Sequence, residues 1–235
     1  MKKVLVTRPF ADAIITSKKI NRFGFITTIC PLIILNQRKH TLDTSYNPDV
    51  LIFSSKNSVR FFNYVKFKRK MVLCIGEGTY KELKQNKYQN IINVDGNAKK
   101  ILEKFNEIYG KKKIKVLHPC GTNIKSEFKK YFLMQESEYL QLPVYSLDKK
   151  NMEPYLFNNF FKDGGKIVLL FSQLTAESFV ESFYKHKLQD LKCFIKILAI
   201  SKNISNYLKK YNFKNLIVPK KPNEHSLIST LKEKI

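Results

Sequence analysis

Hydroxyl-bearing residues and glycines recur where short apolar runs of this sequence end. Val50–Phe53 is followed by Ser54 and Ser55, and Ile167–Phe171 is followed by Ser172. Each run leads into a segment with apolar residues at helical spacing, so these hydroxyls stand where a helix begins. Helix N-termini expose backbone N–H groups that attract carboxylates or phosphates. The pattern indicates chemistry directed at anions, although each hydroxyl alone is also an ordinary helix cap.

Eight strand ends of this kind are predicted along the chain. They are Thr7-Arg8, Ser54-Ser55, Gly76–Thr79, Asp95-Gly96, His118–Thr122, Ser172–Thr175, Ser201–Ser205 and Pro219–Lys221. The set holds few carboxylates, no paired acid and base, and no nucleophile beside a base. His118 is the one histidine at such an end, and we interpret it as a turn residue. Eight similar ends on a basic chain favour an anion-binding site over eight unrelated caps.

Common cofactor and metal motifs do not occur. Gly76-Glu77-Gly78 lacks the third glycine and the downstream acidic residue of a dinucleotide fingerprint, and no GxxxxGK[ST] phosphate loop is present. The cysteines, at positions 30, 74, 120 and 193, lie far apart without a CxxC pair. The histidines also lack metal-ligand spacing. The sequence therefore predicts neither a metal site nor a disulfide framework, as is usual in a reducing cytoplasm.

Charge is the extreme feature of the composition. The 235 residues include 43 Lys and Arg against 19 Asp and Glu, a net charge of +24. The positive charge has two possible explanations. Most of the surplus is lysine, which a drift in the base composition of the gene would produce. The functional explanation is a polyanionic partner. A hydrophobic content of 43% predicts a globular protein. No apolar run is long enough to cross a membrane.

Strands that alternate with helices predict a parallel α/β fold. The first 35 residues contain a strand at Val4–Val6, a helix from Ala11 to Ile20 and a strand at Phe25–Cys30. Further strands are expected at Val50–Phe53, 71–75, 91–94, 113–117, 138–142, 166–171, 195–200 and 216–218. Ligands of such sheets bind beyond the carboxyl ends of the strands, which is where the hydroxyls and glycines stand.

The two halves of the chain also repeat one another in order. DVLIFSSKNSV (49–59) corresponds to KIVLLFSQLTA (166–176), and CIGEGTYKEL (74–83) to AISKNISNYL (199–208). LVTRP (5–9) corresponds to KVLHP (115–119), CPLIIL (30–35) to LPVYSL (142–147), and NIIN (90–93) to NLIV (215–218). A repeat that keeps its register predicts an internal duplication of a β/α half.

This ordered set of motifs resembles the uroporphyrinogen-III synthase family over nearly the full length. The resemblance implies two flavodoxin-like α/β domains joined by a two-stranded linker, with the active site in the interdomain cleft. Residues 1–33 plus 149–235 would form one domain and 37–142 the other, with linker strands at 34–36 and 143–148. The sequence alone would equally allow a cut near residue 110.

The resemblance implies an enzyme that closes hydroxymethylbilane to uroporphyrinogen III with inversion of ring D and loss of water, without a cofactor. Tyr145 matches the family's tyrosine after Pro-Val and would help the hydroxide leave. Thr79 matches the family's threonine, whereas its counterpart in the second copy is Ile204, so Ser201 or Ser205 would substitute. Arg8, Ser55 and Ser172 match strand-end positions expected to bind substrate.

The resemblance also bears on partners. Besides the polycarboxylate substrate, we expect transient contact with the upstream hydroxymethylbilane synthase, no membrane contact, and a cytoplasmic monomer. The high positive charge suggests an alternative, a basic two-domain module that binds nucleic acid or another anion without catalysis. That alternative predicts an affinity that falls steeply with salt.

Overall fold

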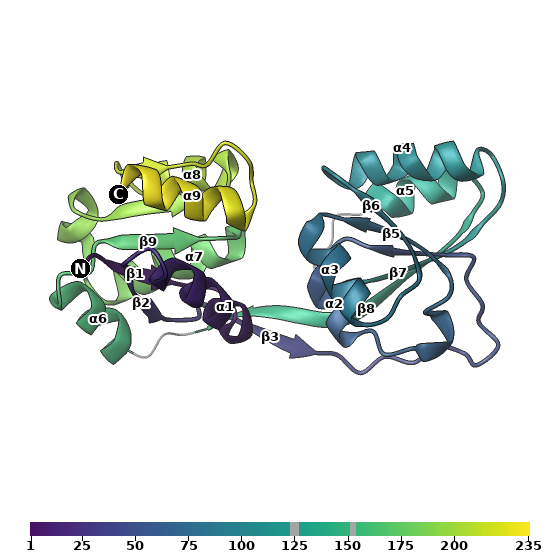
Figure 1. Cartoon of the computed structure of the whole chain (residues 1–235), viewed down its shortest axis with the longest axis horizontal. Helices are drawn as coiled ribbons and strands as arrows, with labels where there is room; N and C mark the ends of the chain where they lie inside the picture. Colours follow the sequence, from purple (N-terminus) through teal and green to yellow (C-terminus); the bar gives the residue numbers. More distant parts are fainter. Residues whose placement is uncertain (123–126, 151–153) are drawn as a thin grey trace. The chain divides into compact units, whose positions relative to one another are not determined.

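The chain folds into two compact units, each with its own β-sheet (Figure 1). The computed structural model describes residues 1–122, 127–150 and 154–235. Unit 1 consists of Met1–Ile34 and Asp148–Ile235, and unit 2 of Leu35–Leu147. The chain therefore begins unit 1, completes unit 2 and then returns to finish unit 1.

Unit 1 has a parallel sheet in the order β11-β10-β9-β1-β2. Its strands are β1 (Lys3–Val6), β2 (Ile26–Ile29), β9 (Ile167–Leu170), β10 (Lys196–Ala199) and β11 (Leu216–Ile217). Its helices are α1 (Phe10–Asn21), α6 (Pro154–Lys162), α7 (Gln173–Lys185), α8 (Lys202–Lys209) and α9 (Glu224–Lys234), with a 3-10 turn at Gln189–Cys193. Successive strand residues point to opposite faces. Val4 and Val6 accordingly pack in the core with α1 and α9, and Leu5 in the core with α6, α7 and α8.

Unit 2 has a sheet in the order β3-β8-β7-β4-β5-β6. Its strands are β3 (Ile33–Gln37), β4 (Val50–Phe53), β5 (Met71–Ile75), β6 (Asn90–Val94), β7 (Lys115–Gly121) and β8 (Glu138–Lys149). Its helices are α2 (Lys56–Phe61), α3 (Glu77–Gln85), α4 (Ala98–Tyr109) and α5 (Glu127–Met134), with a 3-10 turn at Val65–Phe67. Leu51 and Phe53 pack with α2 and α3, whereas Val50 and Ile52 pack with α4 and α5. All four β4 residues are fully buried, which explains their continuous apolar run.

Strands β3 and β8 carry the chain between the units and are neighbours in one sheet. The N–H of Lys150 donates to the carbonyl of Leu32, and the N–H of Arg38 donates to the carbonyl of Val144. Residue numbers rise along one strand as they fall along the other, so this pair is antiparallel. The pairs β4–β5, β4–β7, β5–β6 and β7–β8 are parallel.

The two sheets have the same order once the sequence repeats are matched. Pairing β4 with β9, β5 with β10, β6 with β11, β7 with β1 and β8 with β2 turns the order of the five-stranded sheet into that of five strands of the other, and β3 is the additional sixth strand. The repeated motifs indicate the first four of these pairs, whereas the motif at 30–35 overlaps β3 rather than β2. The α/β class with two mostly parallel sheets is thus confirmed, and the duplication itself stays a prediction.

Four local expectations are wrong. Strand β7 continues to Gly121, so His118 lies within a strand rather than in a turn. The strands expected separately at 138–142 and 143–148 form one unbroken strand, β8, because its pairing continues with β7 and then β3. The apolar spacing of Val59, Phe62 and Val65 predicts a helix to about Val65, but α2 ends at Phe61. Helix α6 was not expected, although its apolar side chains recur at helical spacing.

Candidate functional site

In each unit, the candidate residues gather at three neighbouring strand ends. In unit 2, Ser55 follows β4 and Thr79 follows β5, while Tyr145 on β8 reaches the end of β7. In unit 1, Arg8 follows β1 and Ser172 follows β9. Ser201 and Ser205 follow β10, and the order β10-β9-β1 makes these ends adjacent. Parallel strands bring all of these positions to the carboxyl edge of their sheet.

Tyr145 is the one aromatic residue among the candidates, and it is buried. Its side chain is 7% exposed and lies in the core that contains β4, α2 and α3. Its hydroxyl is hydrogen bonded with Ser55, and its ring lies 6.3 Å from that of Phe61, centroid to centroid. Burial raises the pKa of the Tyr145 phenol, and the hydrogen bond with Ser55 partly opposes that rise. The phenol therefore stays protonated at neutral pH and can donate.

Gly121 leaves the room that the Tyr145 ring occupies. A Cβ at Gly121 would lie 3.0 Å from Cζ and 3.2 Å from the hydroxyl oxygen of Tyr145, which is closer than most Cβ contacts in proteins. A register shift between Cys120 and Gly121 pairs Gly121 with Tyr145 directly, because Cys120 pairs with Pro143. This bulge aims Tyr145 across the end of β7.

Ser55 and Thr79 open the two helices that follow β4 and β5. The Ser55 Oγ caps α2 by accepting from the backbone N–H of Asn57 at 3.2 Å. Thr79 is buried in the first turn of α3, after Gly76, whose φ of 80° lies in the left-handed region. Arg60 Nε donates to Glu82 Oε2 at 3.0 Å and ties α2 to α3. The two helix starts are thus held side by side.

The serines of unit 1 open helices in the same way. Ser172 Oγ accepts from the N–H of Thr175 at 3.1 Å and lies 2.6 Å from the hydroxyl of that residue. Ser201 Oγ accepts from the N–H of Ile204 at 3.5 Å. Ser205 lies further along α8 and is buried. Ser201, rather than Ser205, therefore stands at the strand end.

Arg8 is held by side chains of its own unit. Its guanidinium donates to Thr16 and to Glu224 at 3.0 Å each and to Asp12 at 3.2 Å. It also lies 4.5 Å from the ring centroid of Phe171. Burial opposes ionisation of Glu224, but hydrogen bonds from Lys19 and Thr16 and the charges of Arg8 and Lys19 outweigh it, so the pKa of Glu224 is lowered. Arg8 joins α1 to α9, a role that the sequence pattern did not indicate.

His118 belongs to a hydrogen-bonded chain that sequence reasoning missed. Its Nε2 lies 3.1 Å from Ser54 Oγ, and its Nδ1 lies 2.7 Å from Tyr139 Oη. The ring is fully buried and meets Phe128 edge-on at 4.9 Å. Burial lowers the pKa of His118 to about 4, so the ring is neutral at physiological pH. The only sequence signal was a histidine within the run 115–121.

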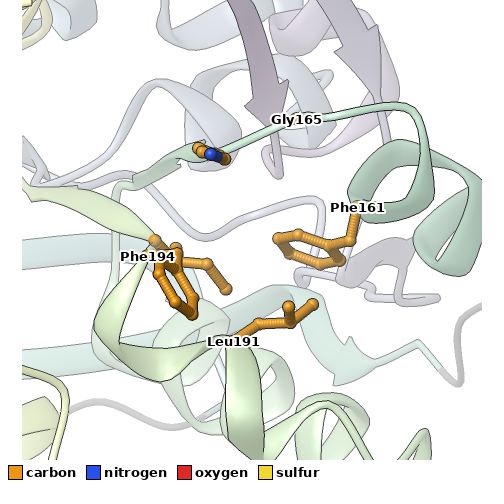
Figure 2. Close-up of a pocket in the computed structure, with 6 residues that line it drawn as sticks. Phe161, Gly165, Leu191 and Phe194 are labelled. Atoms are coloured by element: carbon orange, nitrogen blue, oxygen red, sulfur yellow. The ribbon is translucent and has the colours of Figure 1, made fainter.

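A surface pocket of about 260 Å³ lies at the other edge of the unit 1 sheet (Figure 2). Its lining residues are Phe161, Gly165, Lys166, Leu191, Phe194 and Ile195. Lys166 immediately precedes β9 and Ile195 precedes β10, so this pocket is at the amino ends of the strands. Figure 2 shows its apolar side chains converging, with no strand-end hydroxyl among them. The pocket is therefore separate from the candidate site.

The carboxyl edges of the two sheets offer hydroxyls, helix N-termini and one enclosed phenol. The described part of the chain contains no group of three or more His, Cys, Asp or Glu side chains placed to hold an ion. Hydroxyls and helix N-termini bind carboxylates, and a protonated phenol can donate its proton. Anion binding and proton donation are thus the chemistry that these residues can perform.

Comparison with known proteins identifies the family. The sequence profile described as uroporphyrinogen-III synthase HemD matches residues 16–229. The chain belongs to the uroporphyrinogen-III synthase family. A comparison with curated protein sequences found no match.

Solved structures of this family share the fold. A uroporphyrinogen-III synthetase from Helicobacter pylori has a TM-score of 0.65 at 17% identity, covering 98% of each chain. A mutant uroporphyrinogen III synthase from the extremely thermophilic bacterium Thermus thermophilus has a TM-score of 0.57 at 12% identity, covering 99% of this chain and 98% of that one. Within the described residues, no helix is long and apolar enough to span a bilayer.

Proposed function

We propose that the chain catalyses the reaction for which its family is named, as a hydro-lyase that closes hydroxymethylbilane to uroporphyrinogen III. The family match over residues 16–229 carries the proposal. The reaction removes a hydroxyl from the linear tetrapyrrole and joins ring D through its substituted carbon, which inverts that ring. The pyrrole nitrogen supplies the electrons that expel the hydroxide, so no cofactor is needed.

The proposed substrate explains why the strand ends hold hydroxyls and helix starts. Hydroxymethylbilane carries eight carboxylates, which helix N-termini and hydrogen-bond donors bind well. Ser172 opens a 13-residue helix and Ser201 an 8-residue helix, and both sit at the carboxyl edge of the unit 1 sheet. The net charge of +24 attracts the same polyanion from a distance. These strand ends are therefore the proposed carboxylate-binding positions of unit 1, and Ser55 and Thr79 are those proposed for unit 2.

Tyr145 is proposed as the acid that assists departure of the hydroxide. Its raised pKa keeps the proton on the phenol, and the hydrogen bond with Ser55 orients the hydroxyl. The buried ring cannot turn away, since Gly121 and Phe61 lie against it. A fixed phenol that donates its proton to the departing hydroxide lowers the activation barrier of the reaction by general acid catalysis. The larger task is to hold the chain so that only the inverting closure occurs.

Arg8 is proposed to support substrate binding indirectly, by holding the turn after β1 in place. Its guanidinium already contacts Asp12 and Glu224, so a substrate carboxylate would compete with two carboxylates of the protein. The same contacts hold the turn after β1 against α1 and α9. Loss of Arg8 should therefore weaken unit 1 as well as the affinity for substrate.

An isomer assay tests the proposed function. Hydroxymethylbilane closes spontaneously to the type I ring, so purified protein should shift the product to type III. Chromatographic separation of the two isomers after oxidation to the porphyrins gives their ratio. Folded protein that yields only the type I isomer would remove the proposal.

A further inference from the structure

The buried chain Tyr139–His118–Ser54 leads from strand β8 through β7 to the end of β4. Both ring nitrogens of His118 meet hydroxyls, Tyr139 Oη at 2.7 Å and Ser54 Oγ at 3.1 Å. His118 and the partners that hold it lie within unit 2. Ser54 is half-buried and directly precedes Ser55, whose side chain bonds Tyr145. The chain therefore ends one residue before Ser55 along the backbone, at the carboxyl end of β4.

The direction of these hydrogen bonds follows from the chemistry of the three groups. A neutral imidazole donates from one nitrogen and accepts at the other. The phenol is a stronger acid than the serine hydroxyl, and its contact is the shorter, so Tyr139 donates to Nδ1. Nε2–H then donates to Ser54 Oγ. The Ser54 proton is left to point away from the ring, toward another acceptor.

We propose that His118 is a positioning residue that presents the Ser54 hydroxyl as a hydrogen-bond donor to a substrate carboxylate. The inference rests on the proposed function and adds two residues to it. Hydrogen bonds in series polarise one another, so the Ser54 proton becomes a better donor than that of an isolated serine. A polycarboxylate substrate makes use of such a donor.

A nucleophilic role for Ser54 does not fit the same geometry. A serine activated by histidine needs the imidazole to take up a proton, and a carboxylate on the far nitrogen usually stabilises that charge. Here the far nitrogen meets the neutral phenol of Tyr139, whose own pKa is raised by burial. Phe128 closes the edge of the ring. The surroundings favour a neutral imidazole that transmits a hydrogen bond over one that accepts a proton.

Two substitutions of His118 separate its two contacts. His118→Gln keeps a polar atom near the position of Nε2, within reach of Ser54. His118→Asn keeps one near Nδ1, within reach of Tyr139 only. Both should lower the stability of unit 2 similarly, because each leaves the hydroxyl of one half-buried residue without its partner. The proposal expects kcat/KM for type III formation within ~3-fold of wild type for Gln and a loss of ~10- to 100-fold, mainly in KM, for Asn.

A double-mutant cycle tests whether His118 acts through Ser54. Ser54→Ala should lose about as much kcat/KM as His118→Asn, and the double variant should lose no more than either one. Ser137→Ala is the matched control. Its hydroxyl is also buried and accepts from the N–H of Ile114 at 3.2 Å, but at the amino ends of β7 and β8. That variant should lose stability and keep kcat/KM.

Nitrogen-15 NMR of the wild-type protein shows which ring nitrogen of each histidine carries the proton. This measurement does not depend on the activity of any variant. At neutral pH His118 should carry its proton on Nε2 and none on Nδ1. A proton on Nδ1, equal losses for Gln and Asn, or additive losses in the double variant would each overturn the proposal. A different result would show that the proposed function itself is wrong: the wild-type protein would form only the type I isomer. In that case the inference about His118 would also be wrong.

Discussion

The hydroxyl of Tyr145 is hydrogen bonded with Ser55, a residue ninety positions earlier that also caps helix α2. One serine thus fixes both the start of a helix and the orientation of the buried phenol. The contact joins the end of β4 to β8 across β7, the strand between them in the sheet. It makes the proposed acid part of the rigid sheet rather than of a loop.

Replacing Tyr145 by phenylalanine should separate chemistry from folding. The ring that packs on Gly121 and Phe61 is kept, and only the hydroxyl bonded to Ser55 is lost. We expect kcat for type III formation to fall by ~10²- to 10⁴-fold, the range of general acid catalysis. The free energy of unfolding in urea should change by about 1 kcal/mol. Unchanged kcat would remove Tyr145 from the mechanism.

Tyr88 provides the matched control for that experiment. It is buried in the same core, and among the described residues its hydroxyl has no hydrogen-bond partner. Tyr88→Phe removes an unpaired buried polar group, so stability should hold or rise by about 1 kcal/mol. Activity should stay at the wild-type level. A similar loss of kcat in both variants would point to a general effect of removing a phenol from this core.

Gly121→Ala should displace Tyr145 without touching its chemistry. The new methyl group would lie 3.0 to 3.2 Å from three atoms at the tip of the ring, so the phenol must shift by a few tenths of an ångström. We expect type III formation to fall by at least ~10-fold and the free energy of unfolding by ~1–3 kcal/mol, as for other overpacked cores. Isomer ratios and urea titrations measure both. Gly78→Ala, where a Cβ meets nothing within 4 Å, should leave stability unchanged or higher.

Local signals in the sequence were sufficient for most of the elements and for three helix caps. The fully apolar run Val50–Phe53 predicts a strand buried on both faces, and a serine before a helical pattern predicts the caps at Ser55, Ser172 and Ser201. Each of these features depends on residues that are neighbours in the chain. They could therefore be predicted from the sequence with the principles of capping and periodicity alone.

Contacts between distant residues could not be predicted in the same way. The meeting of Tyr145 with Ser55 depends on the register shift at Cys120 and Gly121, which tertiary pairing decides. His118 and Pro119 looked like a turn because both residues are uncommon in buried strands. The hydrogen bonds to Ser54 and Tyr139 are what make His118 acceptable there. Long-range partners decide such positions.

Ser172→Asp should distinguish a helix cap from a substrate contact. Aspartate caps a helix as well as serine does and suits its N-terminus, so the free energy of unfolding should stay within ~0.5 kcal/mol of wild type. Its charge would repel a polyanionic substrate, and we expect KM to rise at least ~10-fold, less so at high salt. Ser172→Ala should lose about 1 kcal/mol of stability. If KM is unchanged by Asp, Ser172 is a cap only.

The buried imidazole of His118 should make the stability of the protein depend on pH between about 4 and 6.5. Burial lowers its pKa to about 4 in the folded chain, whereas an exposed histidine titrates near 6.5. In that window the unfolded chain binds the proton and the folded chain does not, so lowering the pH favours unfolding. The free energy of unfolding should fall by about 3 kcal/mol from pH 7 to pH 4 through this group.

The contribution of His118 can be isolated with His118→Gln, which has no titrating ring. Urea titrations from pH 7 down to pH 5 lie above the ordinary pKa of the carboxylates, so the slope there comes mainly from histidine. We expect the variant to lose most of the slope. His186→Gln is the control, because the pKa of that half-buried ring is also lowered and its loss should flatten the curve less. An unchanged slope in His118→Gln would mean that the folded chain protonates His118 as readily as the unfolded one.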